Sequence, residues 1–151
     1  MKVAIGSDHA GYKLKELVKN YLKRKKIEFK DFGTDSEAPV DYPDFAYPVA
    51  EAVAAGEFER GIVICGSGVG VTITANRVKG IRAVLAYDTY TAKQSRRHGD
   101  CNVLALVGKR LTKARAARIV AVWLKTEFSG EERHLRRIKK IDRHVPRGIE
   151  G

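Results

Sequence analysis

The fold is decided by the stretch Gly61-Ile62-Val63-Ile64-Cys65-Gly66-Ser67-Gly68-Val69-Gly70-Val71. Its apolar residues predict a buried strand that runs into Cys65, and Val71 to Val78 predict a helix. Between them glycine stands at every second position, which lets the backbone come close to a ligand. The first N–H groups of a helix attract anions, so we expect an oxyanion or phosphate site here, in a field that favours the Cys65 thiolate. The alternative is a tight turn beside a buried cysteine.

The glycine loop lacks the marks of two common phosphate-binding loops. A Walker-type loop needs a Lys-Ser/Thr pair after its last glycine, whereas Val71-Thr72 follows here. A dinucleotide fingerprint has glycine at its first, third and sixth positions, whereas the third glycine here comes at the fifth. Asp88 follows the next predicted strand, where a ribose-binding acid would lie. Nucleotide binding is therefore disfavoured but stays an alternative.

The composition predicts one soluble domain over residues 1–151. The chain is 44% apolar and 31% charged, and no apolar run approaches the length of a membrane span. Because the amino terminus enters a strand at once, without a signal peptide, we expect a cytoplasmic protein. In that compartment Cys65 and Cys101 are expected to be free thiols, and their spacing from the histidines predicts no metal site.

The net charge of +11 favours an acidic ligand. Much of the excess lies in residues 13–30, where lysines alternate with apolar residues at helical spacing and predict a solvated helix face. A second concentration of basic residues lies in residues 109–147. Nucleic-acid binding is disfavoured, because the few aromatic residues are not interleaved with the basic runs.

Strands and helices alternate along the chain, which predicts an α/β fold: a three-layer, doubly wound sheet of five parallel strands with right-handed connections. We expect the Rossmann-like strand order 2-1-3-4-5 and a basic C-terminal helical tail over residues 130–151. The predicted strands are Lys2–Gly6, Ile27–Phe32, Arg60–Ile64, Arg82–Ala86 and Asn102–Val107. The predicted helices are Leu14–Leu22, Phe45–Ala55, Val71–Val78, Thr89–Arg97 and Lys113–Lys125.

In such a sheet, ligands bind beyond the carboxyl ends of the strands, at the point where the strand order reverses. In the expected order this point lies between the first and third strands, so Asp8 and His9 would face Cys65 and the glycine loop. A histidine after a strand is often only a hydrogen-bonding residue. Opposite a thiol and an anion-binding loop, however, His9 is more readily explained as part of a site.

Several motifs, in order from the first strand to about Ile141, resemble the sugar-phosphate isomerase family of the B-type ribose-5-phosphate isomerases. They are Gly6-Ser7-Asp8-His9-Ala10-Gly11, Asp41-Tyr42-Pro43-Asp44, Cys65-Gly66-Ser67-Gly68-Val69-Gly70, Ala75-Asn76-Arg77 with Gly80-Ile81-Arg82-Ala83, Ser95-Arg96-Arg97-His98, and Arg133-His134-Leu135-Arg136-Arg137. The resemblance implies a doubly wound sheet, homodimers or dimers of dimers, and no metal. It also implies a reaction that interconverts an aldose phosphate and its ketose through an enediolate.

The resemblance implies a role for each matching residue. Cys65 would be the base that moves the proton between C2 and C1, Ser67 would assist ring opening or bind the sugar, and His98 would open the furanose ring in the neighbouring subunit's site. The implied substrate-binding residues are Asp8, His9, Tyr42, Gly66, Gly68, Gly70, Asn76, Arg110, Arg133 and Arg137. Enediolate chemistry needs a base, donors for the developing oxyanion and an acid or base for ring opening, while guanidinium groups suit phosphate.

The chain departs from the family pattern at three places. Ser67 stands where many relatives carry threonine, which keeps the hydroxyl. Gly99 stands where relatives often carry asparagine, so a hydrogen bond to a sugar hydroxyl would be lost. Gly130-Glu131-Glu132 replaces the usual pair of glycines before the first arginine of the tail. The tail 130–151 is expected to cross to the partner subunit or to pack near it.

The sequence therefore predicts a metal-free, cofactor-free isomerase that interconverts ribose 5-phosphate and ribulose 5-phosphate. Relatives that act on allose 6-phosphate or galactose 6-phosphate give an alternative substrate. A non-catalytic phosphate- or nucleotide-binding module is an alternative of another class, because the glycine loop and the basic tail alone would allow it. We expect no nucleic-acid partner and no membrane association.

Overall fold

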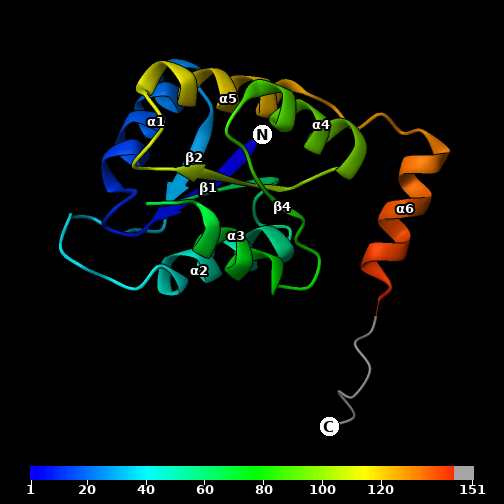
Figure 1. The fold of residues 1–151 in the computed structure, drawn as a ribbon, viewed down its shortest axis with the longest axis horizontal. Helices are drawn as coiled ribbons and strands as arrows, with labels where there is room; N and C mark the ends of the chain where they lie inside the picture. The colour runs from blue at the N-terminus through cyan, green and yellow to red at the C-terminus, as the bar shows by residue number, and fades with distance from the viewer. Residues whose placement is uncertain (145–151) are drawn as a thin grey trace, which may run out of the picture.

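The computed structural model describes residues 1–144 and confirms the predicted α/β class. The strands are β1 (Lys2–Ser7), β2 (Glu28–Asp31), β3 (Arg60–Cys65), β4 (Ala83–Leu85) and β5 (Val103–Val107). The helices are α1 (Tyr12–Arg24), α2 (Pro43–Ala54), α3 (Val69–Asn76), α4 (Thr89–Gly99), α5 (Lys113–Lys125) and α6 (Glu132–Asp142). Helices α1, α4 and α5 cover one face of the parallel sheet, and α2 and α3 cover the other (Figure 1). Residues 145–151 of the predicted tail lie outside the described part.

The predicted strand order is wrong in one detail. The observed order is β2-β1-β3-β5-β4, so β5 rather than β4 pairs with β3. All residues of β5 are buried, as a strand between two neighbours requires, whereas β4 has only three residues, all half-buried, as is typical of a sheet edge. Strands β1 and β3 are still neighbours, with Ser7 opposite Ile64, so the predicted crevice between their carboxyl ends is retained.

Alternating side chains of the sheet build two cores, one on each face. Val3 and Ile5 of β1 point to the α1–α5 face, where they join a large cluster around Trp123. Ala4 and the Cys65 side chain point to the opposite face, which is lined by small residues of α2 and α3. Cys65 is therefore held on the same side of the sheet as the helix that follows the glycine loop.

Side-chain caps fix where α4 and α5 begin. The Asp88 carboxylate accepts the Thr91 N–H at 2.7 Å, and the Thr112 hydroxyl accepts the Arg115 N–H at 3.2 Å. The predicted bounds of α5 are confirmed, and the other predicted elements differ only near their ends. Within residues 1–144, no helix combines the length and the apolar character needed to cross a membrane.

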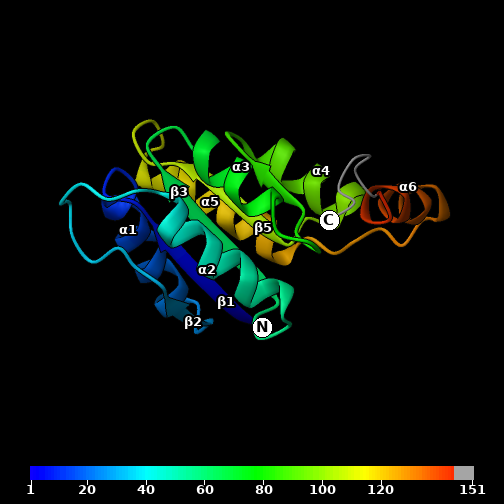
Figure 2. The same ribbon diagram turned by 90° about the horizontal axis from the view of Figure 1, so that it is seen from below.

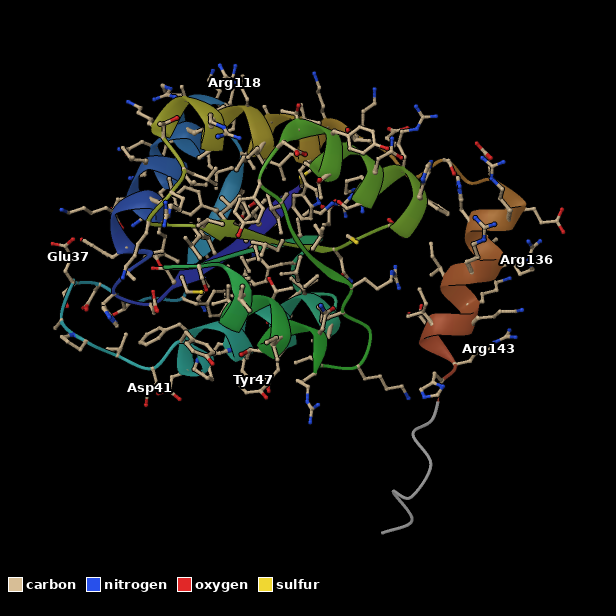
Figure 3. All side chains as sticks on the ribbon, in the orientation of Figure 1. Glu37, Asp41, Tyr47, Arg118, Arg136 and Arg143 are labelled. Carbon is tan, nitrogen blue, oxygen red and sulfur yellow. The ribbon has the colours of Figure 1, made fainter. Side chains whose placement is uncertain are left out.

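Helix α6 extends away from the rest of the molecule (Figures 1 and 2). One ion pair ties its last turn to the chain before β4, because Arg82 Nη1 donates to the two Asp142 oxygens at 3.1 and 2.8 Å. Most of its side chains are exposed, including Arg136 and, just past its end, Arg143, which lie at the periphery of the molecule (Figure 3). Helix α6 therefore packs little against the rest of its own chain, apart from its contact with α4.

A fully buried lysine joins α1 to the end of β2. Lys15 has no exposed surface, and its Nζ donates to both Asp31 carboxylate oxygens, at 2.7 and 2.8 Å, and to the Thr34 carbonyl oxygen. Burial alone would raise the pKa of Asp31, but hydrogen bonds from Lys15, Lys19 and the Gly33 N–H outweigh it and lower this pKa below its ordinary value. Because Thr34 N–H bonds the Ser7 carbonyl at 2.7 Å, this network also braces the chain before Asp8.

We expect Asp31→Asn to lower the free energy of unfolding by about 3 kcal/mol, because the buried Lys15 charge loses its counter-ion. Urea unfolding at pH 7 measures the loss. The native pKa of Asp31 is depressed, so its contribution is present above the unfolded-state pKa of about 3.9 and disappears as the pH falls through the native value. The difference in the free energy of unfolding between wild type and Asp31→Asn should therefore become smaller at acidic pH.

The matched control is Glu37→Gln, which removes an exposed ion pair at 3.4 Å from Lys13. Exposed pairs contribute about 0–1 kcal/mol, so this variant should unfold almost as the wild type does. A loss for Asp31→Asn no larger than for Glu37→Gln would show that the buried network does not stabilise the fold.

Candidate active site

The glycine loop after β3 places a thiol at the start of a helix. Gly68 is the residue before α3 and has a φ of 74°, a left-handed conformation that favours glycine. Its N–H donates to Cys65 Sγ at 3.2 Å. The first helical bond of α3 runs from Thr72 N–H to the Gly68 carbonyl, so the preceding N–H groups of Gly70 and Val71 are available to an anion. The predicted strand, loop and helix are confirmed, with Cys65 only 4% exposed.

The loop is closed on its outer side by an aromatic ring. Tyr42, just before α2, lies so close to α3 that a Cβ on Gly70 would stand 2.6–2.9 Å from its ring atoms. Any side chain at position 70 would therefore displace the Tyr42 ring from the loop. Ser67 is exposed, and its hydroxyl accepts the Val69 N–H at 3.2 Å. Tyr42 and Ser67 thus lie at the two ends of the glycine loop.

The carboxyl end of β1 lies beside this loop, as predicted. Asp8 is buried, its N–H donates to the Ile64 carbonyl at 3.2 Å, and its Oδ1 accepts the Gly11 N–H at 2.9 Å. His9 Nδ1 accepts the Val40 N–H at 3.1 Å. A nitrogen that accepts carries no proton, so neutral His9 bears its proton on Nε2 and can donate from that atom to a ligand.

The end of β5 completes the site on the other side. Gly108 N–H donates to the Cys65 carbonyl at 2.8 Å, and Lys109 N–H donates to the Gly66 carbonyl at 3.2 Å. An open cavity of about 480 Å³ is lined by Gly66, Ser67, Tyr87, Val107, Lys109 and Arg110. The structure therefore brings Arg110 next to the loop, which follows from β5 being the neighbour of β3.

The sequence analysis missed two residues of this cavity, Tyr87 and Lys109. Tyr87 is half-exposed beyond the end of β4, and the stem of Lys109 lies 3.3 Å from where a Gly66 Cβ would be. Both follow the carboxyl ends of strands, so the rule that ligands bind at these ends could have found them. No recognised motif contains them, which is why they were overlooked.

Asn76 is not brought to Cys65. It lies at the far end of α3 from the glycine loop, where its side chain accepts the Ala83 N–H at 2.8 Å and donates to the Ala83 carbonyl at 3.0 Å. Both polar ends of the amide are thus used to hold the start of β4. The predicted contact with substrate stays a prediction for this residue.

A second cluster of predicted site residues lies at the opposite end of the sheet. Helix α4 starts beyond the carboxyl end of β4 and runs back, so His98 in its last turn lies near the start of β5. Arg133 and Arg137 stand on α6, which projects past that edge (Figures 1 and 2). Arg133 Nη2 lies 3.2 Å from Glu131, whereas no carboxylate within residues 1–144 pairs with Arg137. The predicted site residues therefore form two separate clusters. We name Cys65 with its neighbours the first half-site, and His98 with the two arginines the second half-site.

No group of three or more His, Cys, Asp or Glu side chains gathers as a metal site in the described part of the chain. Cys65 and Cys101 are both free thiols there. The chemistry available at the first half-site is that of a thiol, backbone N–H groups, a hydroxyl and cationic side chains.

Comparisons with known proteins find relatives over almost the whole chain. A family model described as ribose/galactose isomerase matches residues 3–141. The chain is 47% identical over 150 residues to a Bacillus subtilis protein named putative sugar phosphate isomerase YwlF, covering 99% of this chain and all of that protein. It is 44% identical over 140 residues to ribose-5-phosphate isomerase B of Escherichia coli, with 93% of each chain covered. The structure of ribose-5-phosphate isomerase B from Clostridium thermocellum superposes with a TM-score of 0.92 at 51% identity, covering 94% of this chain and 95% of that one.

Proposed function

The chain belongs to the ribose/galactose isomerase family, and we propose that it interconverts ribose 5-phosphate and ribulose 5-phosphate through an enediolate. The observation that carries the proposal is the placement of Cys65, whose Sγ accepts the Gly68 N–H at the start of α3. The next two residues of the same loop, Gly66 and Ser67, line the open cavity together with Arg110. Aldose–ketose isomerisation needs a base next to donors that hold the developing oxyanion. Two of the relatives are named as ribose-5-phosphate isomerases, and this supports ribose 5-phosphate rather than allose 6-phosphate as the substrate of this chain.

In the proposed reaction, the Cys65 thiolate removes the proton from C2 and returns it to C1. The N–H groups of Gly70 and Val71 hold the enediolate oxygen, and the Ser67 hydroxyl binds the sugar or assists ring opening. His9 donates from Nε2, and Arg110 binds the phosphate together with the arginines of the second half-site. Asp8 and Tyr42 border the sugar, because they lie at the edges of the same loop.

The proposed site is shared between two subunits of a homodimer. His98, Arg133 and Arg137 lie at the far end of the sheet from Cys65, so they can serve only a neighbour's Cys65. Exposed apolar side chains favour an interface: Tyr42, Val69 and Ile73 border the first half-site, and Leu135 and Ile141 lie on α6. The tail from residue 130 would then pack on the partner, within a single domain over residues 1–151. A cytoplasmic location and the absence of a nucleic-acid partner stay predictions.

A coupled assay with purified protein, comparing ribose 5-phosphate with allose 6-phosphate, tests the proposed function. We expect turnover of ribose 5-phosphate after treatment with a metal chelator, with a kcat/KM well above that for the hexose phosphate. A protein that binds both sugar phosphates and converts neither would instead be the binding module considered above. Faster conversion of allose 6-phosphate would keep the family and overturn the substrate.

Arg137→Ala should raise KM for ribose 5-phosphate by about one to two orders of magnitude, because it removes a charge-assisted contact worth about 1.5–3 kcal/mol. Arg133→Ala should behave alike. Steady-state kinetics with both sugars measures the effect: unphosphorylated ribose should be converted equally poorly by wild type and variant, since it lacks the group that the arginine binds.

The neighbouring Arg136 offers a matched control. It is exposed on the same helix and is assigned no substrate contact, so Arg136→Ala should leave KM within about threefold, a change of roughly 0.6 kcal/mol. Equal losses on phosphorylated and unphosphorylated sugar in Arg137→Ala would indicate a folding role for Arg137 instead.

A further inference from the structure

The imidazole of His134 lies at the junction of α4 and α6. His134 is 3% exposed, although the helix that carries it is mostly exposed. Its ring lies against that of His98, with the ring centroids 4.1 Å apart and the planes tilted by 32°. The two rings are thus in direct contact face to face at a tilt, and His134 supports the exposed His98 ring from one side.

Two hydrogen bonds define the protonation of His134. Arg133 Nε can only donate, so His134 Nε2 accepts from it, at 3.3 Å. The proton of the neutral ring is then on Nδ1, which donates to Ser129 Oγ at 2.7 Å. The Ser129 N–H in turn donates to the Arg97 carbonyl of α4 at 3.1 Å. His134 therefore links the helix that carries His98 to the helix that carries Arg133.

The surroundings keep this ring neutral. Burial lowers the pKa of His134, and His98 from α4 and Arg133 and Arg137 from α6 lower it further, while Glu131 acts in the opposite direction. A neutral ring is what the Arg133 contact requires, because a protonated Nε2 would have no lone pair to offer.

We propose that His134 is a positioning residue that fixes both the His98 ring and the Arg133 guanidinium of the second half-site. This inference rests on the proposed function, in which His98 opens the furanose ring and Arg133 binds the phosphate. An arginine side chain loses much of its rotamer entropy when it becomes ordered. Holding Arg133 and His98 before substrate arrives reduces that cost at the moment of binding.

The neutral ring also predicts a pH dependence of binding. As the pH falls through the lowered pKa of His134, Nε2 gains a proton and its hydrogen bond from Arg133 is lost. The positive charges of protonated His134 and of Arg133 then lie next to each other, close to His98 and Arg137. KM for ribose 5-phosphate should therefore rise on acidification below about pH 6.5, the ordinary pKa of histidine.

Two variants separate the two contacts. His134→Phe keeps a ring against His98 and removes both hydrogen bonds, so we expect KM to rise about tenfold while kcat stays within about threefold. It should also abolish the rise of KM at acidic pH.

His134→Gln keeps an acceptor toward Arg133 and removes the stacked ring, so we expect KM within about threefold and a loss of about tenfold in kcat on ribose 5-phosphate.

Measuring kcat in both directions of the reaction distinguishes a positioning role from a purely structural one, which would lower kcat equally in both directions. Ribulose 5-phosphate has its 5-hydroxyl esterified and cannot close a furanose ring through C2, so its conversion needs no ring opening. His134→Gln should therefore lose less in kcat on ribulose 5-phosphate than on ribose 5-phosphate. The ratio of kcat/KM in the two directions stays fixed by the equilibrium constant, so KM for ribulose 5-phosphate should rise. The control Asp142→Asn, which loosens α6 by removing the Arg82 ion pair, should affect both directions equally.

Equal losses in kcat in both directions, in both His134 variants, with KM for ribose 5-phosphate unchanged, would overturn the proposal and leave His134 a packing residue. Nitrogen-15 NMR of the wild-type imidazoles tests the geometry without any substrate. We expect the His134 Nδ1–H tautomer and a shift of the Nε2 resonance in Arg133→Ala; an Nε2–H tautomer would also overturn the proposal. If the wild type converts neither sugar phosphate, the proposed function fails, and the NMR result still decides whether His134 holds Arg133.

Discussion

Cys65→Ala should abolish isomerisation while binding of ribose 5-phosphate stays within about tenfold of wild type. A general base contributes about 10²–10⁴ to the rate, and within the first half-site the thiol lies next to the N–H groups that would hold the enediolate. The coupled assay measures the rate and isothermal titration measures binding. An alanine variant that kept more than about a tenth of the wild-type rate would show that another group removes the proton.

Cys101 provides the matched control for this prediction. Burial raises the pKa of the Cys101 thiol, although Arg82 and Arg96 oppose the shift, so this thiol stays protonated at neutral pH. Cys101→Ala should therefore keep activity. In the wild type, ribose 5-phosphate should slow the alkylation of Cys65 by iodoacetamide and leave that of Cys101 unchanged. Equal rates of Cys65 alkylation with and without ribose 5-phosphate would place this thiol outside the site.

Much of the fold could be predicted because periodicity and glycine placement are local signals. The strand that ends at Cys65 and the helix that follows the glycine loop are both found, and α5 is found to the residue because Thr112 caps its start. The predicted positions of β4 and β5 in the sheet were wrong, because they were taken from a common Rossmann-like strand order and not from any property of the two strands. The complete burial of β5 and the brevity of β4, which show that β5 is central, become visible only in the structure.

The site was predictable where a motif carries it and unpredictable where only tertiary structure does. Asp8, His9, Cys65 and Arg110 all lie at the carboxyl ends of β1, β3 and β5, because these parallel strands are neighbours and end on the same side of the sheet. The two contacts of the Asn76 amide with Ala83 depend on where β4 begins, which no spacing in the sequence reveals. The stacking of His98 on His134 likewise depends on the direction in which α6 leaves α5, so the motif Arg133-His134 gave no hint of it.

Mixing two inactive variants should restore activity if the site is shared. A Cys65→Ala chain lacks the proposed base, and a His98→Ala chain lacks the ring-opening group, so each homodimer is nearly inactive on ribose 5-phosphate. A mixed dimer holds one site with both residues intact and one site with neither. Random pairing makes about half of the dimers mixed, each with one good site of two, so about a quarter of wild-type activity should return. The chains must be refolded together, because an obligate dimer need not exchange subunits.

Ser67→Ala is the matched partner that should fail to complement. Ser67 belongs to the same half-site as Cys65, so a dimer of Cys65→Ala with Ser67→Ala has no site with both residues intact. Recovery with His98→Ala but not with Ser67→Ala would place the two half-sites in different subunits. This is what their separation at opposite ends of one sheet requires. Native mass spectrometry shows whether heterodimers have formed. If they have, and the mixture of Cys65→Ala with His98→Ala is no more active than the two parent variants, then His98 takes no part in a shared site. The neighbour's Cys65 would then need another ring-opening group.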